Sequence, residues 1–342
     1  MTAPPPANLM PYRGPGHAIC PLVRPIAAAL AGMLALGACG GGGGDTAAPT
    51  TTTAGPAPTE APSTTVSPTT GAPPTTARAA APTTTPAPPV TTATTRPSPA
   101  GVTALPAGDP ASVATALAEA EPALREPGTT PAQFERLGKA QQVAYRQLVA
   151  NPGWLEDVLR RLPPALGPVV RANVVAGSEL RALTKPRTEL PPWRIVAPAP
   201  ADELLGYYKE AEARYRVPWA YLAAIHLTET RMGRIRGTST AGAQGPMQFL
   251  PATWAQYGEG GDINSNRDAI MAAARYLVRN GAPDDMANAL FNYNRSQRYV
   301  RAVTEYALLM LNHEGAYRGY YHWDVYYRLV DGDRLLPVGY SG

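Results

Sequence analysis

Residues from about 111 to 184 follow a pattern with the three- to four-residue period of an α-helix. One stripe at this spacing is formed by Gln133, Leu137, Ala140, Val143, Ala144 and Leu148. Pro131 stands at the start of this helix, and Asn151-Pro152-Gly153 breaks the chain after it. Two more helices are expected over about 154–161 and 166–183, separated by a pair of prolines. The pattern predicts a small helical bundle or hairpin that supports or spaces the rest of the chain.

A second series of helices follows a proline-containing, irregular segment around 185–193. Its first helix carries a stripe of Leu204, Tyr208, Ala211 and Tyr215. Pro218 is expected to open the next helix and Gly233 to close it, because proline is tolerated in a first turn and glycine readily ends a helix. Another helix is expected to start at Pro251.

Polar residues that can cap helices mark the elements beyond Pro251. Ser265 or Asn266 is expected to cap a helix that runs to about 280, and Ser296 a helix that runs to about 311. A shorter helix over 284–293 is expected between them. These elements make the second series as helical as the first.

The tail of the chain has a different pattern. Residues 323–330 and 334–338 are β-prone and flank Asp331-Gly332-Asp333, which is a hairpin signal. Its aromatic residues are Tyr317, Tyr320, Tyr321, Trp323, Tyr326 and Tyr327. We expect them to pack the hairpin against the helices; stacking on sugar rings is the alternative. The expected fold class is mostly α, with a helical region over 109–190 and a second domain over 191–342 that ends in a β-hairpin.

The first third of the chain lacks the apolar content that a folded core requires. Most of the 39 prolines and many of the 32 glycines lie there, among threonines and alanines. Such a segment cannot offset its chain entropy by burial. We therefore expect residues 39–108 to be a disordered stalk, which at about 3.1 Å per residue could reach roughly 200 Å.

An export signal is expected over residues 1–38. Arg13 and Arg24 precede the apolar run 26–36, which is too short to span a membrane as a helix. The run ends in Leu36-Gly37-Ala38-Cys39, which resembles the lipobox of bacterial lipoproteins. That resemblance implies cleavage before Cys39, lipid attachment to its sulfur and a protein anchored outside the cytoplasm. The alternative is a plain secretory peptide in which the cysteine is incidental.

Charge and metal-ligand patterns restrict the classes of partner. The formal net charge of +4 comes without a block of Lys and Arg, so nucleic acid is not an expected partner. The two cysteines lie near the N-terminus and exclude a disulfide framework for the folded part. His226 lies three residues before Glu229, without a His-Glu-x-x-His pattern, and the loop 258–268 lacks EF-hand spacing. We expect no metal and no cofactor.

Glu229 is the main candidate for chemistry. It shares an apolar stripe with Leu222 and Ile225 and lies in the last turn of its helix. Burial and the negative end of the helix dipole both disfavour a carboxylate, so both should raise the pKa of Glu229. A general acid in glycoside cleavage must be protonated near neutral pH. The alternative is a structural ion pair with one of the arginines at 231, 234 and 236.

Two further segments are expected near this carboxyl group. The glycine-punctuated segment 242–251 feeds a helix, and its glycines let the backbone approach a ligand closely. Tyr293 lies on the apolar stripe of its helix, and a buried tyrosine hydroxyl needs a partner, for which a protonated Glu229 is suitable. Taken alone, each feature could equally be a tight turn or a core aromatic residue.

Three motifs in this order resemble those of lytic transglycosylases with the soluble lytic transglycosylase (SLT) domain. Glu229-Thr230-Arg231-Met232-Gly233 is similar to the Glu-Thr-x-x-Gly of membrane-bound B-type enzymes. The segment 239–251 resembles Ser-x-x-Gly-Ala-x-Gly-Leu-Met-Gln-x-Met-Pro, and Asn292-Tyr293-Asn294 resembles Ala-Tyr-Asn. The resemblance spans about residues 204–311 and is closest to actinobacterial lipoproteins. Pro246 in place of Leu and Asn292 in place of Ala are the departures.

The resemblance implies a goose-type lysozyme-like fold and a peptidoglycan substrate. It implies that Glu229 is the sole acid and base, with the saccharide bound by Ser239, Met247, Gln248, Tyr293 and Asn294. Protonated Glu229 would cleave the β-1,4 bond between MurNAc and GlcNAc, and the C6 hydroxyl of MurNAc would close to a 1,6-anhydro product. The alternatives are a muramidase that hydrolyses the same bond with water and an inactive wall-binding lipoprotein.

Overall fold

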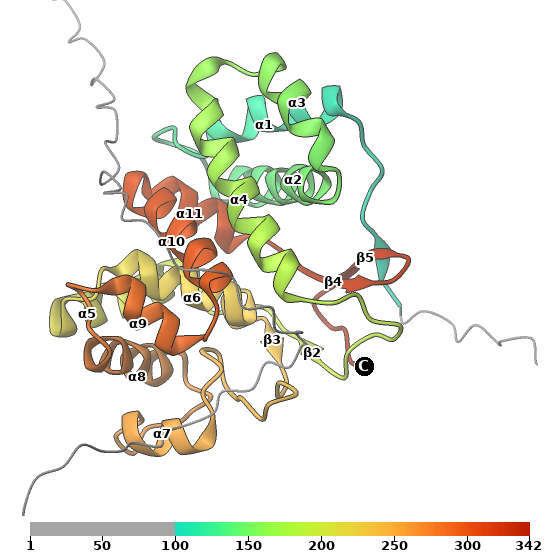
Figure 1. Ribbon diagram of the computed structural model, residues 1–342. Helices are drawn as coiled ribbons and strands as arrows, with labels where there is room; N and C mark the ends of the chain where they lie inside the picture. The colour runs from blue at the N-terminus through green and yellow to red at the C-terminus, as the bar shows by residue number, and fades with distance from the viewer. Residues whose placement is uncertain (1–99) are drawn as a thin grey trace, which may run out of the picture. The chain divides into compact units, whose positions relative to one another are not determined.

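The computed structural model describes residues 100–342, which form a mostly α-helical fold with small strands (Figure 1). The first helices are α1 (Pro110–Ala123), α2 (Pro131–Ala150), α3 (Leu155–Arg161) and α4 (Gly167–Leu183). Asp109 and Thr130 form capping boxes at the starts of α1 and α2. These reciprocal bonds satisfy backbone N–H groups that a helix start leaves free. The helical region expected before residue 190 is therefore present.

The second series comprises seven helices among the described residues. They are α5 (Ala201–Tyr215), α6 (Trp219–Thr230), α7 (Pro251–Tyr257), α8 (Asn266–Arg279), α9 (Met286–Tyr293), α10 (Gln297–Asn312) and α11 (Glu314–Tyr321). Ser265 caps α8 by accepting from the Asp268 amide, and Ser296 caps α10 by accepting from the Arg298 amide, as the sequence predicted. Helix α11 differs from the expectation, since its tyrosines also suit the strands of a hairpin. His313 caps that helix.

The strands form two small sheets. In the first, β4 (Val325–Leu329) and β5 (Gly332–Leu336) make the expected hairpin, with a turn at 330–331. β1 (Thr103–Ala104) pairs antiparallel with β5, so a segment that the sequence analysis placed in the stalk is part of this sheet. In the second sheet, β2 (Arg194–Ile195) pairs antiparallel with β3 (Ile235–Arg236). β3 follows α6 directly along the chain.

One hydrophobic core joins the two helical series. Its buried members run from Val113 in α1 to Trp323 beyond α11. Helix α10 contacts α4 on one side and α6 and α9 on the other, and α2 contacts α11. In Figure 1, α1–α4 are grouped on one side of α10 and α11, and α5–α9 on the other. Helix α10 is thereby packed by helices of both series, and α6 packs against α10.

A buried polar network reinforces this junction. The Gln141 side chain donates to Glu121 at 2.8 Å and accepts from the Trp323 indole at 3.0 Å. The Tyr320 hydroxyl donates to Asn173 of α4 at 2.7 Å. Buried polar groups that are fully paired fix one arrangement of their helices. Because Tyr317, Tyr320 and Trp323 are buried, they belong to the core and do not present faces for sugar stacking.

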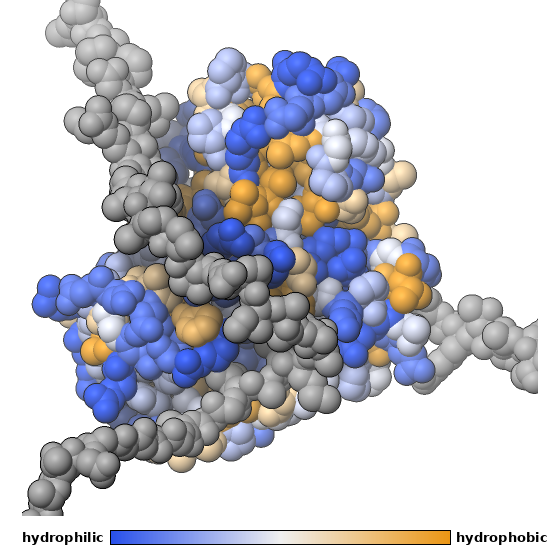
Figure 2. Space-filling view, viewed as in Figure 1, coloured by the Kyte–Doolittle hydropathy of each residue, from blue (hydrophilic) through white to orange (hydrophobic). Residues whose placement is uncertain are grey.

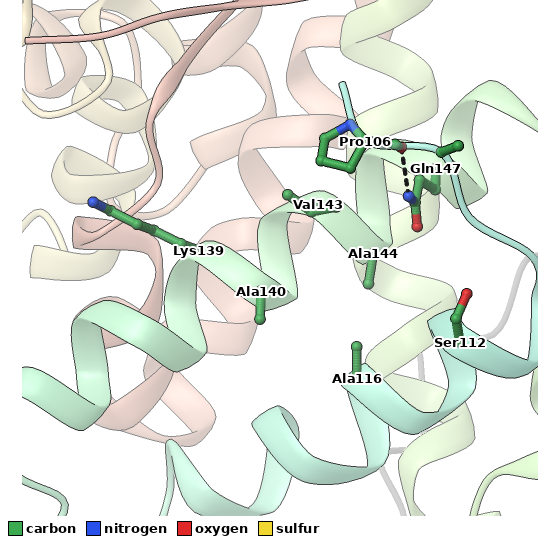
Figure 3. Close-up of a pocket in the computed structure, with 9 residues that line it drawn as sticks. Pro106, Ser112, Ala116, Lys139, Ala140, Val143, Ala144 and Gln147 are labelled. Atoms are coloured by element: carbon green, nitrogen blue, oxygen red, sulfur yellow. Dashed lines mark hydrogen bonds between the residues drawn. The ribbon is translucent and has the colours of Figure 1, made fainter. Parts of the chain in front are cut away.

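A cavity of about 370 Å³ opens between α1 and α2 (Figure 3). Its walls are mostly apolar, with Lys139 at one edge and Gln147 bonded to the Pro106 carbonyl. None of the residues that line it comes from α5–α10. Figure 2 shows apolar residues gathered over the α3–α4 side of the face in view, whereas the surface around α5 and α8 is mostly hydrophilic.

None of the helices within residues 100–342 combines the length and the apolar character that crossing a bilayer would demand. The export signal over 1–38, the lipid attachment at Cys39 and most of the stalk over 39–108 lie outside the described residues.

Candidate active site

Glu229 occupies the last turn of α6, whose residues from Leu222 to Leu227 are completely buried. The Glu229 side chain itself is half-buried, so it keeps one accessible edge. Burial raises the pKa of Glu229 to about 7, against an ordinary value of 4.5. A carboxyl group with this pKa exchanges its proton near neutral pH, as an acid that must also act as a base requires.

Tyr299 in the first turn of α10 is the direct partner of this carboxyl group. Its hydroxyl donates to Oε1 of Glu229 at 2.8 Å, across 70 positions of sequence. The bond favours the charged form and lowers the pKa of Glu229, but by less than burial raises it. Burial also raises the pKa of Tyr299 well above 10, so its hydroxyl stays protonated and remains a donor. Oε1 is thus occupied, whereas Oε2 accepts no hydrogen bond within residues 100–342.

The neighbouring arginines do not neutralise Glu229. The guanidinium of Arg231 lies 5.9 Å from the Trp323 ring, and that of Arg234 lies 5.3 Å from the Tyr321 ring. Within residues 100–342, Glu229 has no ion pair. The structural ion pair considered in the sequence analysis is therefore not formed.

A left-handed stretch of backbone ends α6 and turns the chain away from Glu229. Arg231 and Met232 have φ of 54° and 59°, and Gly233 has φ of 79°. The helix ends at Thr230, close to the expected end at about Arg231, and Arg231 takes the left-handed cap position ahead of Gly233. A side chain at position 233 would lie 3.0 Å from Asn266 and 3.3 Å from His226, so the close packing there requires glycine.

Thr230 connects the end of α6 to the glycine-rich turn. Its hydroxyl donates to the Pro246 carbonyl at 2.5 Å and accepts from the Gly233 amide at 3.1 Å. The threonine beside Glu229 thus has a physical role that the sequence analysis did not assign. It fixes the turn against the helix end that carries Glu229.

The turn itself is held by bonds among its own residues. Gln248 has a positive φ of 53°, and its side-chain amide donates to the Gly245 carbonyl at 3.0 Å. Ser239 accepts from the Ala243 amide at 3.0 Å. Gln244 and Phe249 exchange backbone hydrogen bonds in both directions. Gln248 and Ser239 are both half-buried, so they lie at the surface of a rigid loop.

The Tyr293 hydroxyl donates to the Met247 carbonyl at 2.7 Å rather than to Glu229. The expected Tyr293–Glu229 hydrogen bond is therefore absent, and Tyr299 makes it instead. The two tyrosine rings are stacked, 6.4 Å apart and 6° from parallel, so Tyr293 supports Tyr299 from behind. Tyr299 belongs to the apolar stripe of α10, and its position just after the Asn-Tyr-Asn motif is the signal that could have identified it.

Met247 and Asn294, two other residues expected to bind the saccharide, differ in how far their side chains are buried. The Met247 side chain is completely buried and packs in the core, so the expectation that this side chain contacts a substrate does not fit the structure. Asn294 caps the end of α9 and is half-buried. Asn292, the departure from the motif, donates to the Asn288 carbonyl within its own helix at 2.9 Å.

Three acidic residues in or next to the loop 258–268, together with His226, have their own partners. Glu259 pairs with Arg275 at 3.0 Å, Asp268 accepts from the Asp262 amide, and Asp262 accepts from the Asn264 amide. Burial, with the positive charges of Arg236 and Arg234, lowers the pKa of His226 to about 3, so the ring is neutral. Its Nδ1 lies 2.6 Å from the Tyr208 hydroxyl. Across residues 100–342 no three or more His, Cys, Asp or Glu side chains are grouped as metal ligands.

Comparison with protein families identifies the part of the chain that contains these groups. Residues 206–307 match the family model of the Transglycosylase SLT domain. The chain carries an SLT domain. The match extends from α5 to α10 and therefore includes Glu229, the glycine-rich turn and Tyr299. The searches of curated proteins and of solved structures returned no match.

The SLT domain indicates a glycan-cleaving transglycosylase that acts on peptidoglycan in the cell wall. The mostly helical fold is consistent with the lysozyme-like architecture expected for this domain. The helices α1–α4 lie outside the matched residues, yet they share its core and pack against α10 and α11.

Proposed function

We propose that this protein is a lytic transglycosylase that cleaves the MurNAc–GlcNAc β-1,4 bond and forms 1,6-anhydroMurNAc, with Glu229 as acid and then base. The observation that carries the proposal is a half-buried carboxyl group, free of ion pairs within the described residues, whose pKa is raised to about 7. It lies in the SLT domain and beside the turn that bears Gln248.

In the first step, protonated Glu229 gives its proton from Oε2 to the glycosidic oxygen. Tyr299 holds Oε1, which restricts rotation of the carboxyl group and directs Oε2 at the substrate. As the bond breaks, positive charge develops on the MurNAc ring, and the carboxylate that forms is stabilised by the Tyr299 hydrogen bond. The substrate's own N-acetyl group assists at the reacting carbon.

In the second step, the Glu229 carboxylate accepts the proton of the C6 hydroxyl of MurNAc. The oxygen of that hydroxyl closes on C1 of the same sugar, which leaves the anhydro ring and returns Glu229 to its protonated form. One residue serves both steps because its pKa is near neutral. We assign the support of the saccharide to Ser239, Gln248 and Asn294, which are half-buried, while Tyr293 supports Tyr299.

The other candidate carboxylates are engaged by their own partners, which favours this one-acid mechanism over a two-carboxylate hydrolase. Glycosidases that use water or a covalent intermediate usually have a second carboxylate within about 5–9.5 Å of the acid. Glu259, Asp262 and Asp268 are engaged by Arg275 or by backbone amides, and burial and Tyr299 are the two influences on the pKa of Glu229. A muramidase remains the second candidate.

Analysis of the digestion products tests this proposal directly. Purified peptidoglycan is incubated with the full chain and with Glu229→Gln, and the released muropeptides are analysed by mass spectrometry. We expect anhydro ends, because no water is added during cleavage. These ends are lighter than hydrolysed ends by about 18 Da, the mass of one water molecule. Reducing ends would identify a muramidase instead. No cleavage by the wild-type protein would favour an inactive wall-binding protein.

The pH dependence of cleavage is expected to follow the carboxyl group of Glu229. The acid must be protonated, so the rate should fall as the pH rises above about 7. Tyr299→Phe removes the bond that lowers this pKa, so the falling limb should move to higher pH while kcat decreases. Steady-state rates from pH 5 to 9 measure both effects.

Tyr317→Phe is the matched control for Tyr299→Phe. Tyr317 is equally buried and loses a comparable hydroxyl bond, to the Ala201 carbonyl at 2.7 Å, but it lies on α11 away from Glu229. Its pH profile should match that of the wild type. An unchanged profile for Tyr299→Phe would show that Tyr299 does not tune the acid.

We further propose that the protein acts outside the cytoplasm, anchored through a lipid on Cys39. The support is the lipobox-like sequence that ends at Cys39 and the substrate class that the SLT domain implies. Cys39→Ser should prevent lipid attachment, which membrane fractionation and mass spectrometry would detect.

A further inference from the structure

A polar pocket of about 370 Å³ lies beside the catalytic turn and takes no part in the mechanism above. It is lined by Arg194, Ile235, Arg236, Gly237, Thr238, Gln244, Gly245 and Asn264, and we refer to it as the arginine pocket. Its residues come from the β2–β3 ribbon, the start of the glycine-rich segment and the loop before α8. In Figure 1 the ribbon lies next to the end of α6, from which β3 follows.

Strand register places two positive charges on one face of the ribbon. Arg194 is directly opposite Arg236, and Ile195 is directly opposite Ile235. Directly opposed residues point to the same face, and alternate residues point to opposite faces. Ile195 is buried and Ile235 packs beside it in a small core, so the two arginines project from the other face.

Neither of these two charges forms an ion pair in the part of the chain that the structure describes. No ion pair or side-chain hydrogen bond of residues 100–342 involves Arg194 or Arg236, whereas Arg267 pairs with Glu210 and Arg275 with Glu259. Like charges directly opposed across two strands are destabilising. An anion bound between them would relieve that repulsion.

The walls of the arginine pocket are held by close backbone packing. A side chain at Gly237 would lie 2.7 Å from the Trp193 ring, so this part of the wall rests on the indole. A side chain at Gly245 would lie 2.0 Å from the Ile263 carbonyl oxygen. The pocket is therefore shaped before any ligand binds, which reduces the entropy lost on binding.

The pocket shares Gly245 with the catalytic turn. The Gly245 carbonyl accepts from the Gln248 side chain at 3.0 Å, and the next residue, Pro246, accepts from Thr230 beside Glu229. The arginine pocket and Gln248, which we assign to saccharide binding, therefore share one turn of backbone.

We propose that the arginine pocket binds a carboxylate of the peptide stem that branches from the glycan strand. This inference rests on the proposed function. The stem branches from the MurNAc residue and carries free carboxylates, and a guanidinium group binds a carboxylate through two parallel hydrogen bonds. Two such groups on a preformed wall make the pocket selective for strands that still bear peptides.

The test compares two glycan fragments of equal length, one with its stem peptides and one from which an amidase has removed them. Phosphate-containing wall polymers are first stripped from both, so that phosphate cannot occupy the pocket. Affinities are measured by calorimetry on the full chain carrying Glu229→Gln, which prevents turnover. Arg194→Gln/Arg236→Gln is compared with Arg160→Gln/Arg279→Gln, which removes the same charge from exposed sites outside the pocket.

We expect the parent protein and the control to prefer the peptide-bearing fragment by roughly tenfold or more, the usual effect of a charged hydrogen bond. The pocket variant should lose this preference. An unchanged preference, or an equal loss of affinity for both fragments, would overturn the inference. Failure of the wild-type protein to cleave either fragment would refute the proposed function, while the preference ratio would still report on the pocket.

Discussion

Glu229→Gln is expected to lower the rate of glycan cleavage by about 10²–10⁴-fold, the usual contribution of a positioned acid or base. The amide keeps the shape of the carboxyl group and can still accept the Tyr299 hydroxyl, but it cannot transfer a proton. The measurement is the initial rate of muropeptide release near pH 6. Activity within threefold of wild type would remove Glu229 from the mechanism.

The same substitution should stabilise the protein at high pH, which separates loss of chemistry from loss of fold. The pKa of Glu229 is raised on folding, from 4.5 to about 7. Stability from the protonated group is therefore complete below pH 4.5 and is lost as the pH rises through 7. Because the group is half-buried, we expect the wild type to lose about 2 kcal/mol relative to Glu229→Gln between pH 5 and pH 8. Denaturant unfolding at the two pH values measures the difference.

Gly245→Ala is expected to have the second largest effect, through the catalytic turn. The added methyl group would lie 2.0 Å from the Ile263 carbonyl oxygen, and the residue has a φ of 72°. Backbone cannot yield as a flexible side chain can, so the turn must shift and carry Gln248 with it. We expect a loss of about 2–4 kcal/mol in the free energy of unfolding. Displacement of substrate-holding groups by about 1 Å should lower the rate by about 10²-fold.

Gly242→Ala is the control that isolates steric overlap from backbone strain. Gly242 lies in the same segment with a similar φ of 85°, but its added methyl group would meet nothing within 4 Å. Only the left-handed strain of about 1–2 kcal/mol should appear, with most of the activity retained. Equal effects of the two substitutions would mean that close approach to Ile263 does not fix the turn.

Local sequence patterns predicted much of the fold. The start of α2 was identified because proline suits a first helical turn, where its missing N–H needs no partner, and the starts of α8 and α10 because a serine side chain accepts from an amide two or three positions away. The hairpin of β4 and β5 was predicted because β-prone residues flank the turn-forming Asp331-Gly332-Asp333. Helix α11 was missed, since its tyrosines suit strands equally well and only burial against α2 and α6 makes them helical.

The sequence by itself determined which carboxyl group is the candidate acid. Glu229 lies on an apolar stripe in a last helical turn, which predicts partial burial and a raised pKa, and the resemblance of its segment to lytic transglycosylase motifs distinguishes it from the other acidic residues. The sequence also placed the glycine-rich turn after it. The choice of Glu229 and the position of the glycine-rich turn both follow from residues close to Glu229 along the chain.

Only the tertiary structure decided which groups face that carboxyl. Tyr299 rather than Tyr293 donates to Glu229, the arginines at 231 and 234 turn to aromatic rings, and Arg194 meets Arg236. Each of these depends on the relative rotation and offset of elements far apart in sequence. A rotation of one residue along a helix moves a side chain by about 100°, so packing between α6 and α10, not local periodicity, selects the partner.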